Sequence, residues 1–288
     1  MTSVVIPVFN GDSVLAKTAP SVLESPGVDE WIWVNDGSSD GTAHVLDALV
    51  APVPSAHVVH LPSNRGRSAA RNAGIEASAG DVVVFFDADV EPSATAARQL
   101  AKAACQEGSS ASVARVRPVL EAPHDPYQDY LAHYPRGPSA DLAAGSVLDW
   151  RFFLSGACAI RRDALLEVGP FPEEVLYGED FALGCALARH TPVGLRLAGT
   201  TVRLHNVGHL EDALDRADAF GRGLRAMSSD CRRHALGSII DVPGASQAAS
   251  LGAWGLRRAV GRLGPGYARR RAVRYLLGAR ILSATTRA

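Results

Sequence analysis

Short apolar runs alternate with helical patterns through the first 90 residues, and this alternation restricts the fold more than any other feature of the sequence. Four runs rich in Val, Ile, Trp and Phe predict strands, at residues 4–9, 31–34, 57–61 and 81–86. Three intervening stretches have the apolar spacing of helices, at residues 14–23, 45–50 and 68–79. This order is typical of a mostly parallel sheet with helices on both faces, so we predict an α/β fold.

Polar residues follow each of the four predicted strands. They are Asn10, Asp36, Asn64 with Arg65, and Asp87 with Asp89. In parallel sheets, ligands bind at the carboxyl ends of the strands. We therefore expect four separate segments to converge on one rim of the sheet.

The fourth predicted strand runs directly into Asp87 and Asp89. Alternate residues of a strand point the same way, so the two carboxylates would project together. Such a pair suits Mg²⁺ or Mn²⁺, which takes one or two protein carboxylates and fills its other positions with water and phosphate oxygens. A capped, solvent-exposed turn is the alternative for this spacing, and Glu91 followed by Pro92 supports it.

Arginines surround the start of the predicted helix that follows the third strand. Arg65, Arg67 and Arg71 lie where free backbone amides and the helix dipole favour anions, which predicts phosphate binding, with Arg65 and Arg71 in the nucleotide-binding set. The alternative is a solvated helix face on which the arginines neutralise neighbouring acids. Asp36 can accept a hydrogen bond from a nucleotide base or cap the following turn, for which Asp40 is a second candidate.

The second half of the chain is less regular. Stretches at 152–160 and 193–204 predict strands, and the Pro- and Tyr-containing stretch at 121–149 predicts a long loop or a partly helical insertion. Glu179 and Asp180 begin a predicted helix, where they fit either a general base or a cap. His205 follows a predicted strand and fits either a ligand or a structural histidine.

Composition narrows the class of protein. The chain has 288 residues, 47% of them hydrophobic, so it can bury a sizeable core, and its net charge of −1 gives no overall attraction to nucleic acid. Its four cysteines lack metal-ligand spacing, and we expect no disulfide framework. No basic leader precedes the first strand and no apolar run approaches about 20 residues, so we expect a cytoplasmic protein.

The C-terminal part has a distinct charge pattern. From Ser250 onward there are nine arginines and neither Asp nor Glu. Apolar residues interleaved with these arginines predict helices that either contact an anionic membrane at its inner face through residues 250–288 or pack on the rest of the chain. We predict a catalytic domain at 1–230 and a basic, mainly helical extension at 231–288, with no nucleic-acid partner.

Six motifs in order resemble those of family 2 glycosyltransferases. They are "VVIPVFN", "VNDGSSDGT", "NRGRSAARNAGI", "GDVVVFFDADV", "FFLSGACAIRRDALLEVGPFPE" and "YGEDFALGCAL", and the resemblance covers about residues 1 to 210. It implies a GT-A fold and an inverting enzyme that transfers a sugar from a nucleotide sugar to a hydroxyl acceptor with the help of Mn²⁺ or Mg²⁺. It favours UDP as the nucleotide of the donor. The acceptor would be a glycan, a lipid-linked glycan or a small molecule. No Gln-x-x-Arg-Trp segment follows the last motif, which favours transfer of a single sugar.

The resemblance also implies roles for individual residues. Those at nucleotide-sugar-binding positions are Pro7, Val8, Phe9, Asp36, Arg71 and Asp87. Asp89 matches the main metal ligand, with Asp87 and His205 beside it. Gly156 and Glu179 would lie on the acceptor side, and Asp180 matches the catalytic base of inverting members.

Two alternatives to the glycosyltransferase prediction remain. A nucleotidyltransferase would share the parallel sheet and the metal-binding carboxylates. A catalytically silent module would bind a sugar nucleotide without transferring it. Pro170 and Pro172 stand where the family pattern differs, which affects the expected geometry of the acceptor-side loop.

Overall fold

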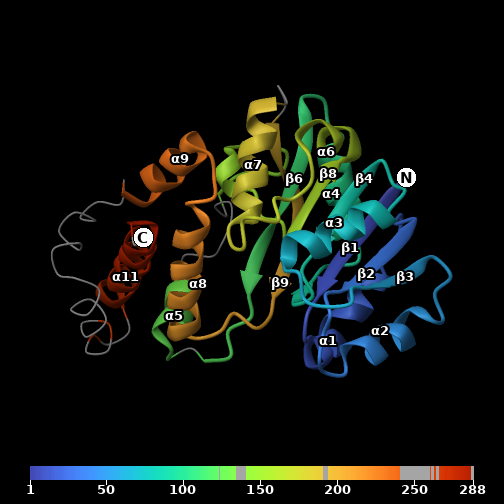
Figure 1. The fold of residues 1–288 in the computed structure, drawn as a ribbon, viewed down its shortest axis with the longest axis horizontal. Helices are drawn as coiled ribbons and strands as arrows, with labels where there is room; N and C mark the ends of the chain where they lie inside the picture. Colours follow the sequence, from blue (N-terminus) through green and yellow to red (C-terminus); the bar gives the residue numbers. More distant parts are fainter. Residues whose placement is uncertain are drawn as a thin grey trace. The chain divides into compact units, whose positions relative to one another are not determined.

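The computed structural model describes residues 1–122, 124–133, 141–190, 194–240, 260, 263 and 266–286 (Figure 1). The chain divides into two compact units. Unit 1 combines Met1–Arg117, Arg136–Glu173 and Asp180–His205, and unit 2 combines Pro118–Pro135, Glu174–Glu179 and Asn206–Ala288. The predicted domains at 1–230 and 231–288 stay a prediction.

A mixed sheet forms the centre of unit 1, with the strand order β3-β2-β1-β4-β8-β6-β9-β5 and β7 paired to β9. Its strands are β1 (Thr2–Val8), β2 (Glu30–Asn35), β3 (Ala56–His60), β4 (Val82–Phe86), β5 (Val90–Glu91), β6 (Ser109–Pro118), β7 (Val147–Leu148), β8 (Ala157–Arg161) and β9 (Gly194–Leu204). β3, β2, β1 and β4 are parallel, whereas β8 runs antiparallel to both β4 and β6. The predicted parallel order therefore holds for the first four strands, and the later strands make the sheet mixed.

Helices connect the strands of unit 1 and cover both faces of its sheet. They are α1 (Asp12–Leu23), α2 (Thr42–Val50), α3 (Arg67–Ala77), α4 (Ala96–Ala104), η1 (Trp150–Phe152), α6 (Arg162–Val168) and α7 (Glu179–His190). The buried residues of α1, α2 and α4 share one apolar core with alternate residues of β1 and β4. The intervening strand residues pack with α3, α6 and α7 in a second core. This confirms the predicted α/β class.

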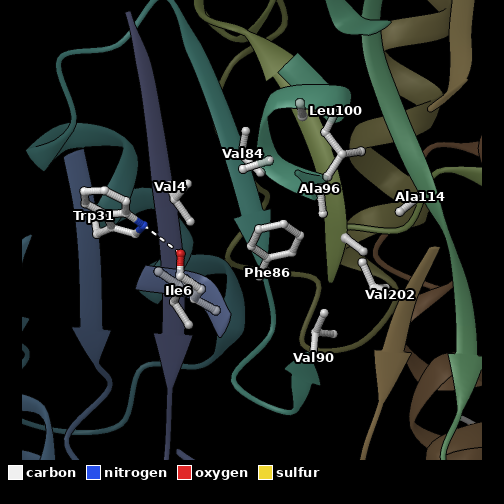
Figure 2. Close-up of a cluster of buried hydrophobic side chains, with 14 of the residues drawn as sticks. Val4, Ile6, Trp31, Val84, Phe86, Val90, Ala96, Leu100, Ala114 and Val202 are labelled. Carbon is white, nitrogen blue, oxygen red and sulfur yellow. Dashed lines mark hydrogen bonds between the residues drawn. The ribbon is translucent and has the colours of Figure 1, made fainter. Parts of the chain in front are cut away.

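The period-two pattern of β4 explains why it lies inside the sheet. Val82, Val84 and Phe86 face the first core, and Val83 and Phe85 face the second, so the strand is buried on both sides. Figure 2 shows Val84 and Phe86 among the side chains of the first core. A strand with this double burial carries its final residue, and the carboxylates that follow it, to a fixed place at the rim.

Helices make up most of the described part of unit 2. They are α5 (Pro126–His133), α8 (Leu210–Gly223), α9 (Ser229–Ile240) and α11 (Tyr267–Thr286), and α11 lies along α8 and α5. Thus the stretch predicted as a loop or partly helical insertion does contain a helix, α5. The predicted basic tail is helical at α11, while most of residues 250–265 lies outside the described residues.

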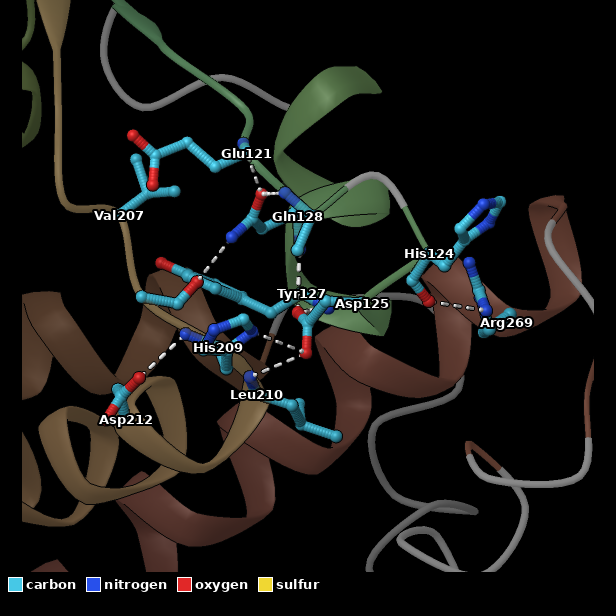
Figure 3. A network of polar contacts seen from close by, with 12 residues as sticks. Glu121, His124, Asp125, Tyr127, Gln128, Val207, His209, Leu210, Asp212 and Arg269 are labelled. Carbon is cyan, nitrogen blue, oxygen red and sulfur yellow. Dashed lines mark hydrogen bonds and ion pairs between the residues drawn. The ribbon is translucent and has the colours of Figure 1, made fainter.

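Polar contacts hold the helices of unit 2 to one another. The Asp125 carboxylate accepts hydrogen bonds from the backbone N–H of Tyr127 and of Leu210, and the Gln128 amide donates to the carbonyl of Gly208 (Figure 3). On α11, the buried Arg269 donates to both Asp129 and the carbonyl of His124. Since these groups are used between neighbouring helices of one unit, they are structural.

Two further expectations are addressed by the structure. Cys105 and Cys158 carry free thiols, whereas Cys185 and Cys231 are each in a disulfide, so not every cysteine of the chain is free. Among the described helices, none has both the length and the apolar character required to cross a membrane.

Candidate active site

The carboxyl ends of β1, β2 and β4 meet at one rim because the three strands are parallel neighbours. Pro7 and Val8 end β1, and Phe9 follows it with 49% of its surface exposed. Because the phenylalanine is apolar yet open to solvent, it offers a flat surface on which a planar ligand can stack. The three residues predicted at the nucleotide position therefore lie at the predicted rim.

Asp36 joins the ends of the first strands to the start of α3. Its backbone N–H donates to the carbonyl of Val8 at 2.8 Å. Its carboxylate accepts hydrogen bonds from the backbone N–H of Arg65 at 2.8 Å and of Gly66 at 2.9 Å. The structure thus gives Asp36 the role of a brace for the loop before α3, while Asp40 accepts from the backbone N–H of Thr42 at the start of α2.

Burial affects the ionisation of Asp36. The side chain is almost completely enclosed, which raises the pKa of this carboxyl above its ordinary value of 3.8. The two backbone N–H groups oppose this effect because they stabilise the carboxylate. The net upward shift means that Asp36 holds its proton to a higher pH than an exposed aspartate.

Arg71 and Asp87 form an ion pair inside the rim. Arg71 Nη2 donates to Asp87 Oδ1 at 2.6 Å, and the guanidinium lies over the ring of Phe171 at 5.3 Å from its centroid. The arginine side chain is only 1% exposed, whereas the aspartate side chain is 37% exposed. The buried cation therefore holds a carboxylate that remains open to a ligand.

Gly156 supports the other side of the Asp87 carboxylate. The backbone N–H of Asp87 donates to the carbonyl of Gly156 at 3.0 Å. A Cβ at position 156 would overlap the Asp87 carboxylate, so only glycine leaves room for it. The residue predicted on the acceptor side thus lies directly against the predicted nucleotide-binding aspartate.

Asp180 approaches the same region from a distant part of the sequence. It is half-buried in the first turn of α7, and its carboxylate accepts from the backbone N–H of Phe181 at 2.7 Å. Burial is the largest cause of the raised pKa of the Cys158 thiol on β8, with smaller effects from the charges of Arg71, Asp87 and Asp180. Glu179, the first residue of α7, is itself buried.

Asp89 and His205 are joined through the backbone. The N–H of His205 donates to the carbonyl of Asp89 at 2.8 Å, and the imidazole Nε2 lies 2.7 Å from Oε2 of Glu91. Within the described ranges, no three His, Cys, Asp or Glu side chains lie close enough together to hold a metal ion by themselves. Because Mg²⁺ and Mn²⁺ need only one or two protein carboxylates when phosphate is present, the half-buried Asp87 and Asp89 still fit such a cation.

Arg65 points to a neighbouring acid. Its guanidinium pairs with the Glu173 carboxylate at 3.0 Å, and both side chains are about half exposed. This matches the solvated-pair alternative for this arginine. The backbone N–H of Arg65 donates to the Asp36 carboxylate, so the main chain of Arg65 is fixed at the rim of the sheet.

Glu91 is a site residue that sequence reasoning did not identify. It was considered only as part of a turn, and a turn does separate β4 from β5, because the backbone N–H of Val90 donates to the carbonyl of Asp87 at 2.9 Å. The expectation that Asp87 and Asp89 project from the strand itself is therefore wrong, since β4 ends at Phe86. Cys158 offered no signal in the sequence, because a lone buried cysteine resembles any small core residue.

Comparison with known proteins identifies related sequences. The model of the family "Glycosyl transferase family 2" matches residues 3–169, more than half of the chain. A 96-residue segment is 41% identical to the undecaprenyl-phosphate 4-deoxy-4-formamido-L-arabinose transferase of Pseudomonas aeruginosa (strain LESB58), covering 32% of this chain and 28% of that protein. A 90-residue segment is 36% identical to the putative teichuronic acid biosynthesis glycosyltransferase TuaG of Bacillus subtilis (strain 168), covering 31% of this chain and 36% of that protein. The matches thus span about a third of the length of these relatives.

Solved structures share the fold. The mannosyltransferase PcManGT from Pyrobaculum calidifontis, in complex with GDP-Man and Mn²⁺, has a TM-score of 0.61 at 18% identity over 96% of this chain and 85% of that chain. TarS 1-349 from S. aureus, in complex with UDP, has a TM-score of 0.59 at 14% identity over 96% of this chain and 90% of that chain. These likenesses confirm the predicted GT-A fold.

Proposed function

The chain belongs to glycosyl transferase family 2, and on this premise we propose that it transfers a single sugar from a nucleotide-diphosphate sugar to a hydroxyl acceptor with inversion. The observation that carries the proposal is the Asp87 carboxylate, whose side chain stays 37% exposed while the buried Arg71 donates to it at 2.6 Å. Gly156 leaves room for this carboxylate on its other side, and the half-buried Asp180 at the start of α7 is a second acid of the same unit. A cation, a ligand-facing carboxylate and a second acid from another segment are the groups that this transfer requires.

The diphosphate of the donor would lie at the exposed side of Asp87. Arg71 holds Asp87 in place, since its guanidinium donates at 2.6 Å, and Gly156 closes the opposite side. Asp87 and Asp89 are the residues that would hold Mn²⁺ or Mg²⁺, with His205 beside them. A bound divalent cation would neutralise the negative charge that develops on the departing diphosphate.

Asp180 is the residue that we propose as the general base. Half-buried at the first turn of α7, it keeps one face toward solvent while its backbone contact fixes the carboxylate. In the proposed reaction, Asp180 accepts the proton of the acceptor hydroxyl as that oxygen bonds to the anomeric carbon and the bond to the diphosphate breaks. A single displacement of this kind inverts the anomeric centre.

UDP is the nucleotide that we propose for the donor. The exposed Phe9 follows β1 and offers a surface on which a base can stack, while Asp36, which follows β2 and braces the loop before α3, would accept the base N–H through a remaining lone pair. Among the structural neighbours, TarS was solved with UDP and PcManGT with GDP-Man and Mn²⁺. The neighbours therefore support a nucleoside diphosphate, and the choice of uridine is our proposal.

A thermal-shift panel tests this function. UDP, GDP, UDP-sugars, GDP-mannose and free sugars are compared with and without Mn²⁺. We expect UDP compounds to raise the melting temperature most, with Mn²⁺ increasing the effect, because a ligand at 100 times its Kd stabilises the native state by about 2.7 kcal/mol. A preference for a non-phosphorylated ligand would overturn the proposal.

The products of turnover separate the alternatives. Release of nucleoside diphosphate in the presence of an acceptor is expected for a glycosyltransferase. Pyrophosphate as the product would instead identify a nucleotidyltransferase. Binding of a sugar nucleotide without hydrolysis or transfer to any of a panel of acceptors would identify a silent module.

A further inference from the structure

Glu91 and His205 form an enclosed pair at the edge of the candidate active site. Oε2 of Glu91 lies 2.7 Å from Nε2 of His205, and Oε1 of Glu91 accepts a hydrogen bond from Arg203 at 3.0 Å. The histidine side chain is 8% exposed and the glutamate side chain 26% exposed. Both carboxylate oxygens are therefore engaged, and the carboxylate has one fixed orientation.

The backbone fixes both partners as well. β5 and β9 pair in antiparallel register, with Val90 opposite Leu204 and Glu91 opposite Arg203. The N–H of His205 then donates to the carbonyl of Asp89. The main chain of His205 thus lies directly beside Asp89, the residue proposed to hold the cation.

The chemistry of this pair selects one tautomer of the imidazole. An ionised carboxylate only accepts hydrogen bonds, so Nε2 of His205 carries the hydrogen that it donates to Glu91. In the neutral ring, Nδ1 then keeps its lone pair. Nδ1 is also the ring nitrogen nearer to the main chain of the residue, and that main chain is hydrogen-bonded to Asp89.

Nδ1 of His205 is open to a ligand. Across the described residues, the hydrogen bond of the imidazole is the one between Nε2 and Glu91. Nδ1 is not among the fully buried polar atoms of the described residues that lack a partner. In many metal sites, a histidine donates one ring N–H to a carboxylate and binds the metal through its other ring nitrogen. His205 has this arrangement, because Nε2 contacts Glu91 and the lone pair of Nδ1 is not used by any donor of the described residues.

We propose that Glu91 is a positioning residue: it holds His205 as the Nε2–H tautomer, so that Nδ1 faces the divalent cation bound with the nucleotide. This inference rests on the proposed function, because it assumes that a cation binds at Asp89. Glu91 itself touches neither the cation nor the substrate. Its effect is to fix the orientation and the tautomer of the histidine.

Titration of Mn²⁺ in the presence of saturating UDP, followed by electron paramagnetic resonance, tests the proposal. Glu91→Gln keeps the size of the side chain but removes the charge and lets an amide N–H compete for the histidine. We expect Mn²⁺ affinity to fall about 10- to 100-fold, the usual range for loss of such a partner. Arg203→Gln is the matched control, since it removes the other partner of Glu91 and leaves the pair with His205, and its Mn²⁺ affinity should stay within about threefold of the wild type.

A purely structural role predicts a different pattern. If the pair only ties β5 to β9, Glu91→Gln lowers the melting temperature and leaves Mn²⁺ affinity unchanged well below that temperature, which would overturn the inference. In a His205→Ala background, Glu91→Gln should have no further effect on Mn²⁺ affinity, because the group through which it acts is gone. A full additional loss in that background would equally contradict it.

Two measurements keep the outcome clear. If Glu91→Gln does not fold, ¹⁵N NMR of the imidazoles of the wild type replaces it, with His205→Gln used to assign the signal of His205. We expect a protonated Nε2 and an unprotonated Nδ1. The reverse tautomer would overturn the inference. Failure of the proposed function looks different, because the wild type would then bind no Mn²⁺ with UDP. Wild-type binding that Asp89→Ala abolishes and Glu91→Gln leaves intact would reject the inference alone.

Discussion

Unit 1 and unit 2 each contain an arginine buried against an aspartate, but they use the pair differently. In unit 1, Arg71 is 1% exposed and its partner Asp87 is 37% exposed. In unit 2, Arg269 is 8% exposed and its partner Asp129 is 10% exposed, with Arg270 on the other carboxylate oxygen. One aspartate keeps a free face toward solvent, while the other is surrounded by arginine.

The difference separates a presented carboxylate from a structural one. A buried ion pair loses hydration energy and is retained where its geometry is needed, either for packing or for a ligand. Asp129 joins α5 to α11, so its two arginines complete a contact between helices. Asp87 lies at the end of a strand with one arginine behind it and a glycine beside it, which leaves a third side for chemistry.

The largest expected effect belongs to Asp180 in unit 1. Asp180→Asn should lower turnover about 10²- to 10⁴-fold, because general-base catalysis contributes in this range. UDP affinity, measured by calorimetry, should stay nearly unchanged, since the proton transfer matters only in the transition state. Asp163→Asn, an acid at the start of α6 that pairs with Arg161, is the control and should retain turnover. Equal turnover in both variants would remove Asp180 from the mechanism.

Asp129→Ala tests the structural half of the comparison. It leaves Arg269 and Arg270 without their shared carboxylate, and breaking a buried pair costs about 3–5 kcal/mol of unfolding free energy. Chemical denaturation measures this loss. Below the transition, UDP affinity should match that of the wild type. A loss of UDP affinity without a loss of stability would mean that this aspartate, too, serves a ligand.

Much of unit 1 could be predicted from sequence because its signals are local. The strand predicted at 81–86 is observed as Val82–Phe86, and the helix predicted at 68–79 as Arg67–Ala77. The place of β8 between β4 and β6 could not be predicted, since pairing across a distance of about 75 residues depends on the whole fold. The same limit hid the contact of Glu91 with His205, two residues 114 positions apart.

The residues of the candidate site also fall into those that local sequence signals indicate and those that depend on contacts between distant segments. The position of Asp87 and Asp89 after a buried strand, and of Asp180 at the start of a helix, could be predicted because both signals are local. That Gly156 lies against Asp87 was not, because "LSGA" contains no local sign of which side chain approaches it. Resemblance supplied the candidate residues, and only the three-dimensional structure shows which of them touch.

Gly156→Ala sharpens the claim that Asp87 is a presented carboxylate. The added methyl group overlaps the carboxylate and must displace it, at a cost of about 1–3 kcal/mol for overpacking. We expect UDP affinity in the presence of Mn²⁺ to fall about tenfold, measured by calorimetry. Gly199→Ala on β9 is the matched control, because a Cβ there meets only Ala144 at 3.4 Å. Unchanged affinity in Gly156→Ala would show that the position of Asp87 does not govern binding.

The smallest expected effect concerns the arginines of α11. This helix contains both an arginine that is paired with an acid and an arginine that is exposed. Arg280 pairs with Asp218 at 2.9 Å, so its charge is used within unit 2, whereas Arg274 is exposed. If this helix contacts an anionic membrane, Arg274→Gln should weaken binding to phosphatidylserine vesicles about fivefold, since a basic residue near the surface contributes about 1 kcal/mol. Arg280→Gln should instead reduce thermal stability and leave vesicle binding nearly unchanged. Sedimentation with anionic and neutral vesicles measures the difference, and equal binding of the wild type to both would rule out the membrane contact predicted from the arginine-rich tail.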